Sequence, residues 1–184
     1  RQRLVAEGHD PLDPGLPVSL VGLGPLEEHL ESNVRRRLTF RSHRPREEAI
    51  VLCAYGSALH HAAWEALMAQ VRRRLMRAGY GYACHAYVGH TAGMSPGPTT
   101  AAIEKAAAMA GVRRVHVVPL LMAVSRLQTD VIAEACRRAA PRSGVKVLYE
   151  ADAILPDGDL AARVAALALR AEGIVARPGE IGVA

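Results

Sequence analysis

The sequence predicts an α/β fold, in which a parallel sheet carries helices on both faces. Short apolar runs alternate along the chain with longer segments whose apolar residues recur at helical spacing. The apolar runs show no polar alternation, which is typical of strands buried on both faces. Such an alternation builds βαβ units, and their ligand crevice lies beyond the carboxyl ends of the strands.

The first strand of the main unit is predicted over Ala49–Tyr55, a run that ends at a glycine. The next segment carries one apolar stripe from Trp64 to Leu75, so it predicts a helix. Ser57 is a residue type that caps helices, and we expect it to cap this one. A second strand is predicted over Tyr82–Val88, followed by the loop Gly89–Pro98, which is rich in glycine and proline.

The middle of the chain repeats this pattern. Thr99–Ala110 is rich in alanine and predicts a helix, and Arg114–Met122 predicts a third buried strand. Ser125 and Gln128 have the spacing of a capping box, which predicts a helix from there to about Ala139. The loop between this strand and this helix is a third candidate for the crevice.

The two ends of the chain each predict one further βα unit. Near the C-terminus, a strand is expected over Val145–Tyr149 and a helix over Leu160–Ala171. Near the N-terminus, Val18–Gly22 predicts a strand and Pro25–Leu38 predicts a helix with leucine and valine at every fourth position. The two units resemble each other weakly, because both helices follow a proline and share this spacing.

This similarity suggests a division of the chain. Residues 1–38 are expected to end a preceding lobe or to form an N-terminal βα extension. Residues 39–48 are polar and predict a linker, residues 49–171 predict the main lobe, and residues 172–184 predict a tail without a clear pattern. The chain opens on Arg1 without a methionine, so we expect it to be part of a longer protein, with processing at the terminus as the alternative.

Composition narrows the classes of function. The chain has 184 residues and a net charge of +5, an excess that suits an anionic small molecule and is too sparse to predict nucleic-acid binding. There is no apolar run of about 18 residues and no signal-peptide pattern, so we expect no membrane partner. Three well-separated cysteines without a C-x-x-C motif argue against a disulfide framework and favour a cytoplasmic location.

Three features together resemble a known family. They are A-Y-G-S at residues 54–57, V-V-P-L-L-M at residues 117–122, and the order of elements near the C-terminus, where the fourth predicted strand is followed by a proline and then a predicted helix. This set resembles the class II chelatases, namely the sirohydrochlorin cobaltochelatase family and its ferrochelatase relatives, over roughly residues 49–169. The resemblance implies a flavodoxin-like sheet in each lobe and two lobes, or two subunits of a homodimer, that face each other across a cleft.

The resemblance also implies a reaction. Chelatases of this kind are lyases that insert a divalent metal, typically cobalt, into a tetrapyrrole such as sirohydrochlorin, in cobalamin or porphyrin biosynthesis. The metal is a substrate, and no tightly bound cofactor is implied. Iron and nickel are the alternative metals.

The sequence departs from the family pattern at its metal ligands. The family carries histidine where this chain has Tyr55, and a second histidine where spacing places Leu127. A glutamate common in the family falls near Gly89 or His90. This lobe therefore resembles a chelatase lobe without its usual ligands, and whether it is itself an enzyme stays open. The alternatives are a catalytically silent module that binds a tetrapyrrole, a metal or a partner, and an unrelated flavodoxin-like binding or regulatory domain.

Two histidines are the candidate metal ligands. Neutral imidazole can accept a pyrrole proton and bind a divalent metal near pH 7. His90 lies on the loop after the second strand, at the expected crevice. His61 begins the first helix and shares a helical face with Glu65 four residues later. An exposed loop and a solvated first turn are the alternative interpretations, and His85 and His116 are expected to be ordinary strand residues.

Four further residues are candidates for binding the substrate. Tyr55 can hydrogen-bond a carboxylate or stack on a macrocycle, although its phenol is a poor metal ligand at pH 7. Ser57 lies at a strand-to-helix turn, where backbone N–H groups favour anions. Arg126 can bind a tetrapyrrole carboxylate in a bidentate manner. Met94 can contact a flat ligand. The alternatives are surface charge for Arg126 and packing for Met94.

Overall fold

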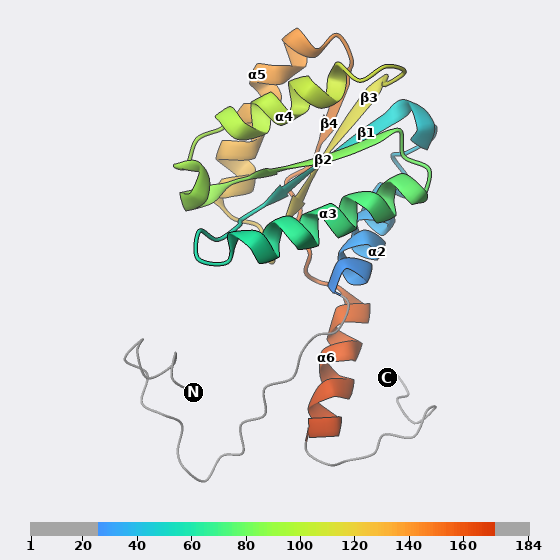
Figure 1. The fold of residues 1–184 in the computed structure, drawn as a ribbon, viewed down its shortest axis with the longest axis vertical. Coiled ribbons are helices and arrows are strands. Elements are labelled where there is room, and N and C mark those ends of the chain that lie inside the picture. The colour runs from blue at the N-terminus through green and yellow to red at the C-terminus, as the bar shows by residue number, and fades with distance from the viewer. Residues whose placement is uncertain (1–25, 172–184) are drawn as a thin grey trace. The chain divides into compact units, whose positions relative to one another are not determined.

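The computed structural model describes residues 26–171. Its centre is a four-stranded, all-parallel sheet with the strand order β2-β1-β3-β4 (Figure 1). The strands are β1 (Glu48–Ala54), β2 (Tyr82–Tyr87), β3 (Arg114–Leu120) and β4 (Lys146–Tyr149). This order and direction confirm the predicted α/β, flavodoxin-like fold.

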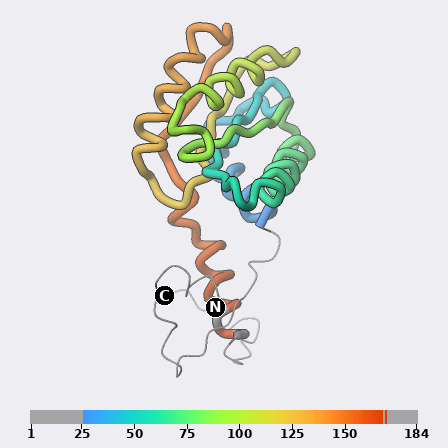
Figure 2. The backbone as a smooth tube through the Cα atoms, turned by 60° about the vertical axis from the view of Figure 1, so that its left-hand side comes forward, coloured from blue at the N-terminus to red at the C-terminus, as the bar shows by residue number. Residues whose placement is uncertain are grey.

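Helices cover both faces of the sheet. They are α2 (Leu26–Leu38), α3 (His61–Arg77), α4 (Gly97–Ala107) and α5 (Ala133–Ser143). A further helix, α6 (Gly158–Ala171), follows β4 along the chain. Helices α2 and α3 pack side by side on one face, and α4 and α5 pack side by side on the other (Figures 1 and 2). Every crossover between parallel strands therefore runs through a helix, as βαβ geometry requires.

The described chain falls into two units. Residues 26–159 form one unit, which contains the sheet and helices α2 to α5. Residues 160–171, within α6, belong to a second unit. No helix among residues 26–171 is long and apolar enough to cross a lipid bilayer.

Several predicted element ends differ from the structure. Helix α3 begins at His61, so Ser57 lies too far upstream to be its N-cap, and its hydroxyl instead accepts a hydrogen bond from the His60 N–H group. Helix α4 begins at Gly97, two residues before the predicted start, because Pro98 fits a first helical turn, where no N–H partner is needed.

The segment 39–48, predicted as a linker, is partly structured. It contains the short 3-10 helix Pro45–Glu47, and its last residue is the first of β1. Helix α2 belongs to the same unit as the sheet. The predicted strand Val18–Gly22, the residue Pro25 at the start of the predicted helix, and the tail 172–184 lie outside the described residues.

The core is built around β1, whose seven residues are all buried. Alternate side chains of β1 face opposite layers, so Val51 packs toward α4 and α5 while its neighbours point to the other face. Cys53, Cys84 and Cys136 are all buried and free, as expected of core thiols. Burial raises the pKa of the Cys84 thiol to about 11.

One buried polar pair joins β1 to β3. Glu48 and His116 are each about 1% exposed, and the His116 Nε2 atom lies 3.0 Å from a Glu48 carboxylate oxygen. The other Glu48 oxygen accepts hydrogen bonds from the backbone N–H groups of His43 and Arg44. Burial lowers the pKa of His116, although the nearby Glu48 opposes this shift. Burial alone would raise the pKa of Glu48, but its hydrogen bonds and His116 lower it.

Replacing Glu48 removes the acceptor that all these donors share. We expect Glu48→Ala to lower the free energy of unfolding by about 3–5 kcal/mol, because His116 and two N–H groups are left buried without their partner. Glu47→Ala is the matched control, since its side chain is 38% exposed, and should cost less than about 1 kcal/mol. Denaturant unfolding measures both. Equal losses in the two variants would contradict the buried-pair interpretation.

The pair also predicts how stability depends on pH. Folding lowers the pKa of both His116 and Glu48, so the unfolded chain binds protons more readily than the folded one. The free energy of unfolding should therefore fall as pH drops below the ordinary histidine pKa of about 6.5. In His116→Gln the fall between pH 7 and pH 5.5 should be shallower. An unchanged slope would exclude His116 as a source of acid sensitivity.

Candidate functional site

The loops that follow the strands meet at the carboxyl edge of the sheet. Tyr55 follows β1 and His90 follows β2, and their rings lie edge to face with centroids 6.2 Å apart. The Thr91 hydroxyl donates a 2.9 Å hydrogen bond to the Tyr55 carbonyl, which ties the two loops together. The structure thus brings two of the predicted site residues, Tyr55 and His90, into contact.

Two tyrosines close over two glycines at this edge. A Cβ atom on Gly89 would lie 2.6 Å from the Tyr55 ring, and one on Gly56 would lie 2.6 Å from the Tyr87 ring. Both glycines also have positive φ, +80° and +70°, which disfavours any larger residue. Tyr55 therefore lies against Gly89 on one side while remaining 40% exposed.

Met94 lies on the loop after β2 with a positive φ of 54°, the one such non-glycine residue among the described residues. Its N–H group donates a 2.8 Å hydrogen bond to the Gly89 carbonyl, which holds the loop in this strained form. Its side chain is 48% exposed. This placement presents a flexible apolar side chain at the carboxyl edge, where the sequence predicted it.

The loop after β3 is held by the predicted capping box. The Gln128 Oε1 atom accepts hydrogen bonds from the Ser125 N–H group and the Ser125 hydroxyl, and the amide of Gln128 donates to the Ala123 carbonyl. The helix continues as a π-helical turn over Leu127–Ile132 before α5 begins. Arg126 is almost fully exposed beside this turn, and it forms an ion pair with Asp130 at 3.3 Å.

Large apolar side chains are concentrated at this edge. Among residues 26–171, six of the nine exposed large apolar side chains lie in the loops after the strands, so we name these six the apolar rim. Its members are Tyr55, Leu59, Met94, Met122, Val124 and Leu155. The loops after β3 and β4 are joined by two backbone hydrogen bonds, from Ile154 to Leu121 and from Leu155 to Met122. Exposed apolar side chains gathered at one edge of the sheet make this edge the candidate binding surface.

A polar cluster lies beside the rim, between β2 and α3. The Tyr87 hydroxyl donates a 2.8 Å hydrogen bond to Glu65, and the His85 Nε2 atom lies 3.1 Å from the same oxygen. These two contacts lower the pKa of Glu65. The ring of His61 packs edge-on against Tyr87 with centroids 5.8 Å apart. Glu65, the expected companion of His61, is thus engaged by β2.

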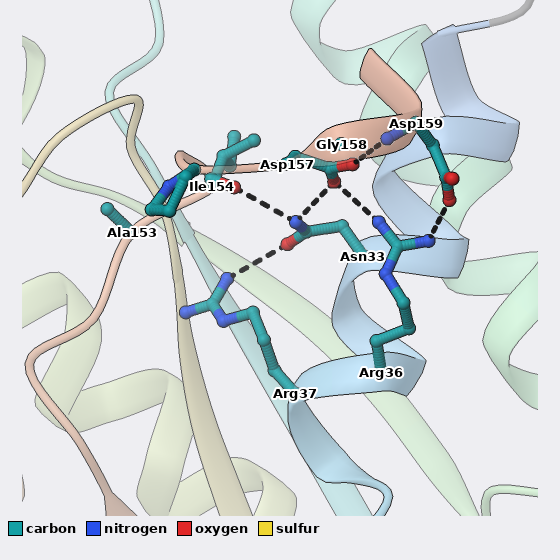
Figure 3. Close-up of a pocket in the computed structure, with 9 residues that line it drawn as sticks. Asn33, Arg36, Arg37, Ala153, Ile154, Asp157, Gly158 and Asp159 are labelled. Atoms are coloured by element: carbon teal, nitrogen blue, oxygen red, sulfur yellow. Dashed lines mark hydrogen bonds and ion pairs between the residues drawn. The ribbon is translucent and has the colours of Figure 1, made fainter. Parts of the chain in front are cut away.

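A cavity of about 470 Å³ lies between α2 and the segment after β4 (Figure 3). Asn33 donates hydrogen bonds to the Ile154 carbonyl at 3.1 Å and to Asp157 at 2.8 Å. Arg36 forms ion pairs of 2.6 Å with both Asp157 and Asp159. These polar groups bind one another, so we assign the network the role of fixing α2 to the segment after β4.

The two predicted metal ligands do not form a metal cluster with other side chains. Within residues 26–171, no three histidine, cysteine, aspartate or glutamate side chains are arranged to hold a metal ion. His90 contacts Tyr55, and His61 contacts Tyr87. Ser57 lies in the turn after β1, where its hydroxyl also accepts a 3.3 Å hydrogen bond from His60.

Sequence reasoning found two members of the apolar rim, Tyr55 and Met94, and missed the other four. The signal for Val124 was present, since it is a large apolar residue in the loop after a predicted strand. Met122 was predicted to be the last residue of that buried strand, but β3 ends at Leu120 and Met122 is exposed. The exposure of Leu59 and Leu155 could not be predicted from the sequence, because an apolar residue in a loop can be either buried or exposed.

The packing of Tyr55 on Gly89 predicts the effect of adding one methyl group. We expect Gly89→Ala to lower the free energy of unfolding by about 2 kcal/mol or more, because it adds a clash to the strain of a positive φ. Gly111→Ala is the matched control: its φ is +82° and its Cβ would meet no atom within 4 Å, so only backbone strain remains. Gly89→Ala should therefore lower the free energy of unfolding more than Gly111→Ala does. This difference should shrink when Gly89→Ala is made in a Tyr55→Ala background. Additive losses would contradict the contact.

The sequence matches no known family model and no curated protein.

Proposed function

We propose that this chain is a chelatase-like lobe that binds a tetrapyrrole at the carboxyl edge of its sheet. The observation that carries the proposal is the apolar rim, which lies where ligands of doubly wound α/β folds bind. In this proposal the lobe takes part in inserting a divalent metal into the macrocycle. Cobalt is the first candidate metal, with iron and nickel as the alternatives, and the place of the reaction is cobalamin or porphyrin biosynthesis.

The carboxyl edge suits both the apolar faces and the carboxylate-bearing perimeter of a polycarboxylate macrocycle. The faces of such a ring are apolar, and Met94, Met122 and Val124 offer exposed apolar side chains to contact them. The perimeter carries carboxylates, and the exposed guanidinium of Arg126 is suited to bind one of them. His90, held against Tyr55, supplies an imidazole at the same edge.

A partner completes the site in this proposal. The partner is a second lobe of the same chain or a second subunit, and it supplies the histidines that the resemblance expects at the positions of Tyr55 and Leu127. This lobe then supplies one wall of the cleft and contacts to the substrate. The three buried, free thiols favour a reducing compartment, and we place the protein in the cytoplasm.

One observation favours a second candidate, a silent module that binds a tetrapyrrole, metal or partner without inserting metal. Tyr55 stands where the resemblance expects a ligand, and its ring fills the space above Gly89. A tyrosine packed in this way shapes a surface and has little affinity for a metal at pH 7. Tetrapyrrole binding without cobalt insertion, measured with a second lobe present, would favour this candidate.

Binding of sirohydrochlorin, followed by its absorbance, tests the proposed surface in the 184-residue chain. We expect Val124→Asp to weaken binding about tenfold, because it places a carboxylate against an apolar ring face. Arg126→Glu should cost about 1.5–3 kcal/mol, the range for a charged hydrogen bond.

Two controls match these variants. Met76→Asp changes an exposed apolar residue on α3, and Arg138→Glu breaks another helical ion pair between residues four apart. Neither should alter the affinity. If the controls weaken binding as much as the rim variants do, the carboxyl edge is not the binding surface.

A further inference from the structure

The opposite edge of the sheet has a different character. Four segments lead into the strands, namely residues 39–48, 78–82, 108–114 and 144–146, each counted through the first residue of its strand. Together they carry six cationic and two acidic side chains: Arg41, Arg44, Arg46, Arg113, Arg114 and Lys146, against Glu47 and Glu48. Most of the net charge of +5 is therefore concentrated at this amino edge.

Two hollows lie along the amino edge and share Arg113 as a lining residue. One has a volume of about 370 Å³ and is also lined by Arg44, Glu47, Glu48 and Arg114. The other has a volume of about 580 Å³ and reaches Lys146 at the start of β4. We name the two together the amino-edge hollow. It crosses the ends of β1, β3 and β4, which are neighbours in the sheet, so it extends over ~10 Å.

The cations of the hollow are loosely paired. Glu47 lies 3.4 Å from Arg113 and 3.7 Å from Arg44, and Arg114 lies 3.7 Å from Glu48. By contrast, Glu134 on α5 lies 2.6 Å from Arg137 and 2.7 Å from Arg138. Each guanidinium has five N–H donors, so these long contacts leave donors for another anion.

Helix dipoles do not account for this arrangement. The C-terminal ends of α4 and α5 lie at the amino edge, and cations in the last helical turn would stabilise them. The four cations of the hollow instead lie outside the helices, at the starts of strands or in the connections before them. Their clustering therefore suits a ligand better than it suits the helices.

We propose that the amino-edge hollow binds a small, freely diffusing ligand that carries two or more phosphate groups. Phosphate oxygens accept bidentate hydrogen bonds from guanidinium, and adjacent phosphates match several cations within a short span. None of the described residues that line the hollow is aromatic, which disfavours the stacking on which single-stranded nucleic acids depend. A span of ~10 Å is also short for a stable protein interface.

Glu47 acts as an internal competitor in this proposal. Its carboxylate is the more exposed of the two acids that line the hollow, and it bridges Arg44 and Arg113. A bound phosphate takes over these guanidinium donors and displaces the carboxylate. Neutralising Glu47 should consequently strengthen binding, whereas removing a cation should weaken it.

Calorimetric titration of pyrophosphate into the 184-residue chain, with divalent metals chelated, tests the proposal. We expect Arg113→Ala and Lys146→Ala each to raise the Kd about tenfold, and Glu47→Gln to lower it about threefold. Arg137→Ala is the matched control, since this side chain is 72% exposed against 77% for Arg113 and is also paired with a glutamate. It should leave the Kd unchanged.

Several outcomes would overturn the proposal. They are the absence of pyrophosphate binding, an equal loss in Arg137→Ala, or no gain in Glu47→Gln. Citrate binding as tightly as pyrophosphate would show a surface selective for charge alone. Tighter binding to vesicles of phosphatidylcholine with phosphatidylglycerol, or to a single-stranded oligonucleotide, would assign the hollow to a membrane or a nucleic acid instead.

Discussion

The burial of β1 is the constraint on which the rest of the structure depends. All seven of its residues are inaccessible to solvent, with β2 and β3 hydrogen-bonded on either side and helices on both faces. A strand in this position accepts polar side chains only if they are fully paired, which Glu48 achieves through His116 and two backbone N–H groups. Accessible chemistry along β1 is therefore confined to the two ends of this strand.

The two ends have acquired different surfaces. At the carboxyl edge, glycines that accept positive φ let Tyr55 and Tyr87 close over the backbone, and apolar side chains remain exposed around them. At the amino edge, arginine and lysine lead into the strands, and the acids among them are too few to neutralise them. One edge thus suits the face of a flat apolar ring, and the other suits a compact anion.

The sequence was sufficient to predict the order of elements and the parallel sheet, because period and length distinguish buried strands from amphipathic helices. It was also sufficient to place Tyr55, His90 and Arg126 at the carboxyl edge. It did not predict which side chains pair. The contact of Glu65 with His85 and Tyr87 joins residues about twenty positions apart, and it depends on the docking angle of α3, which no local pattern specifies. The apolar rim and the amino-edge hollow likewise depend on exposure, which composition does not determine.

The two edges act as electrostatically independent surfaces. Seven residues of β1 span roughly 20 Å, since each residue of a strand advances about 3.3 Å. At physiological ionic strength the Debye length is about 8 Å, so the cations of the amino edge are screened from a ligand at the apolar rim. In the proposed complex, a polycarboxylate at the rim is therefore attracted by local charge, and Arg126 is the cation that we propose for this role. It also follows that a variant that changes the charge at one edge should leave binding at the other edge unchanged.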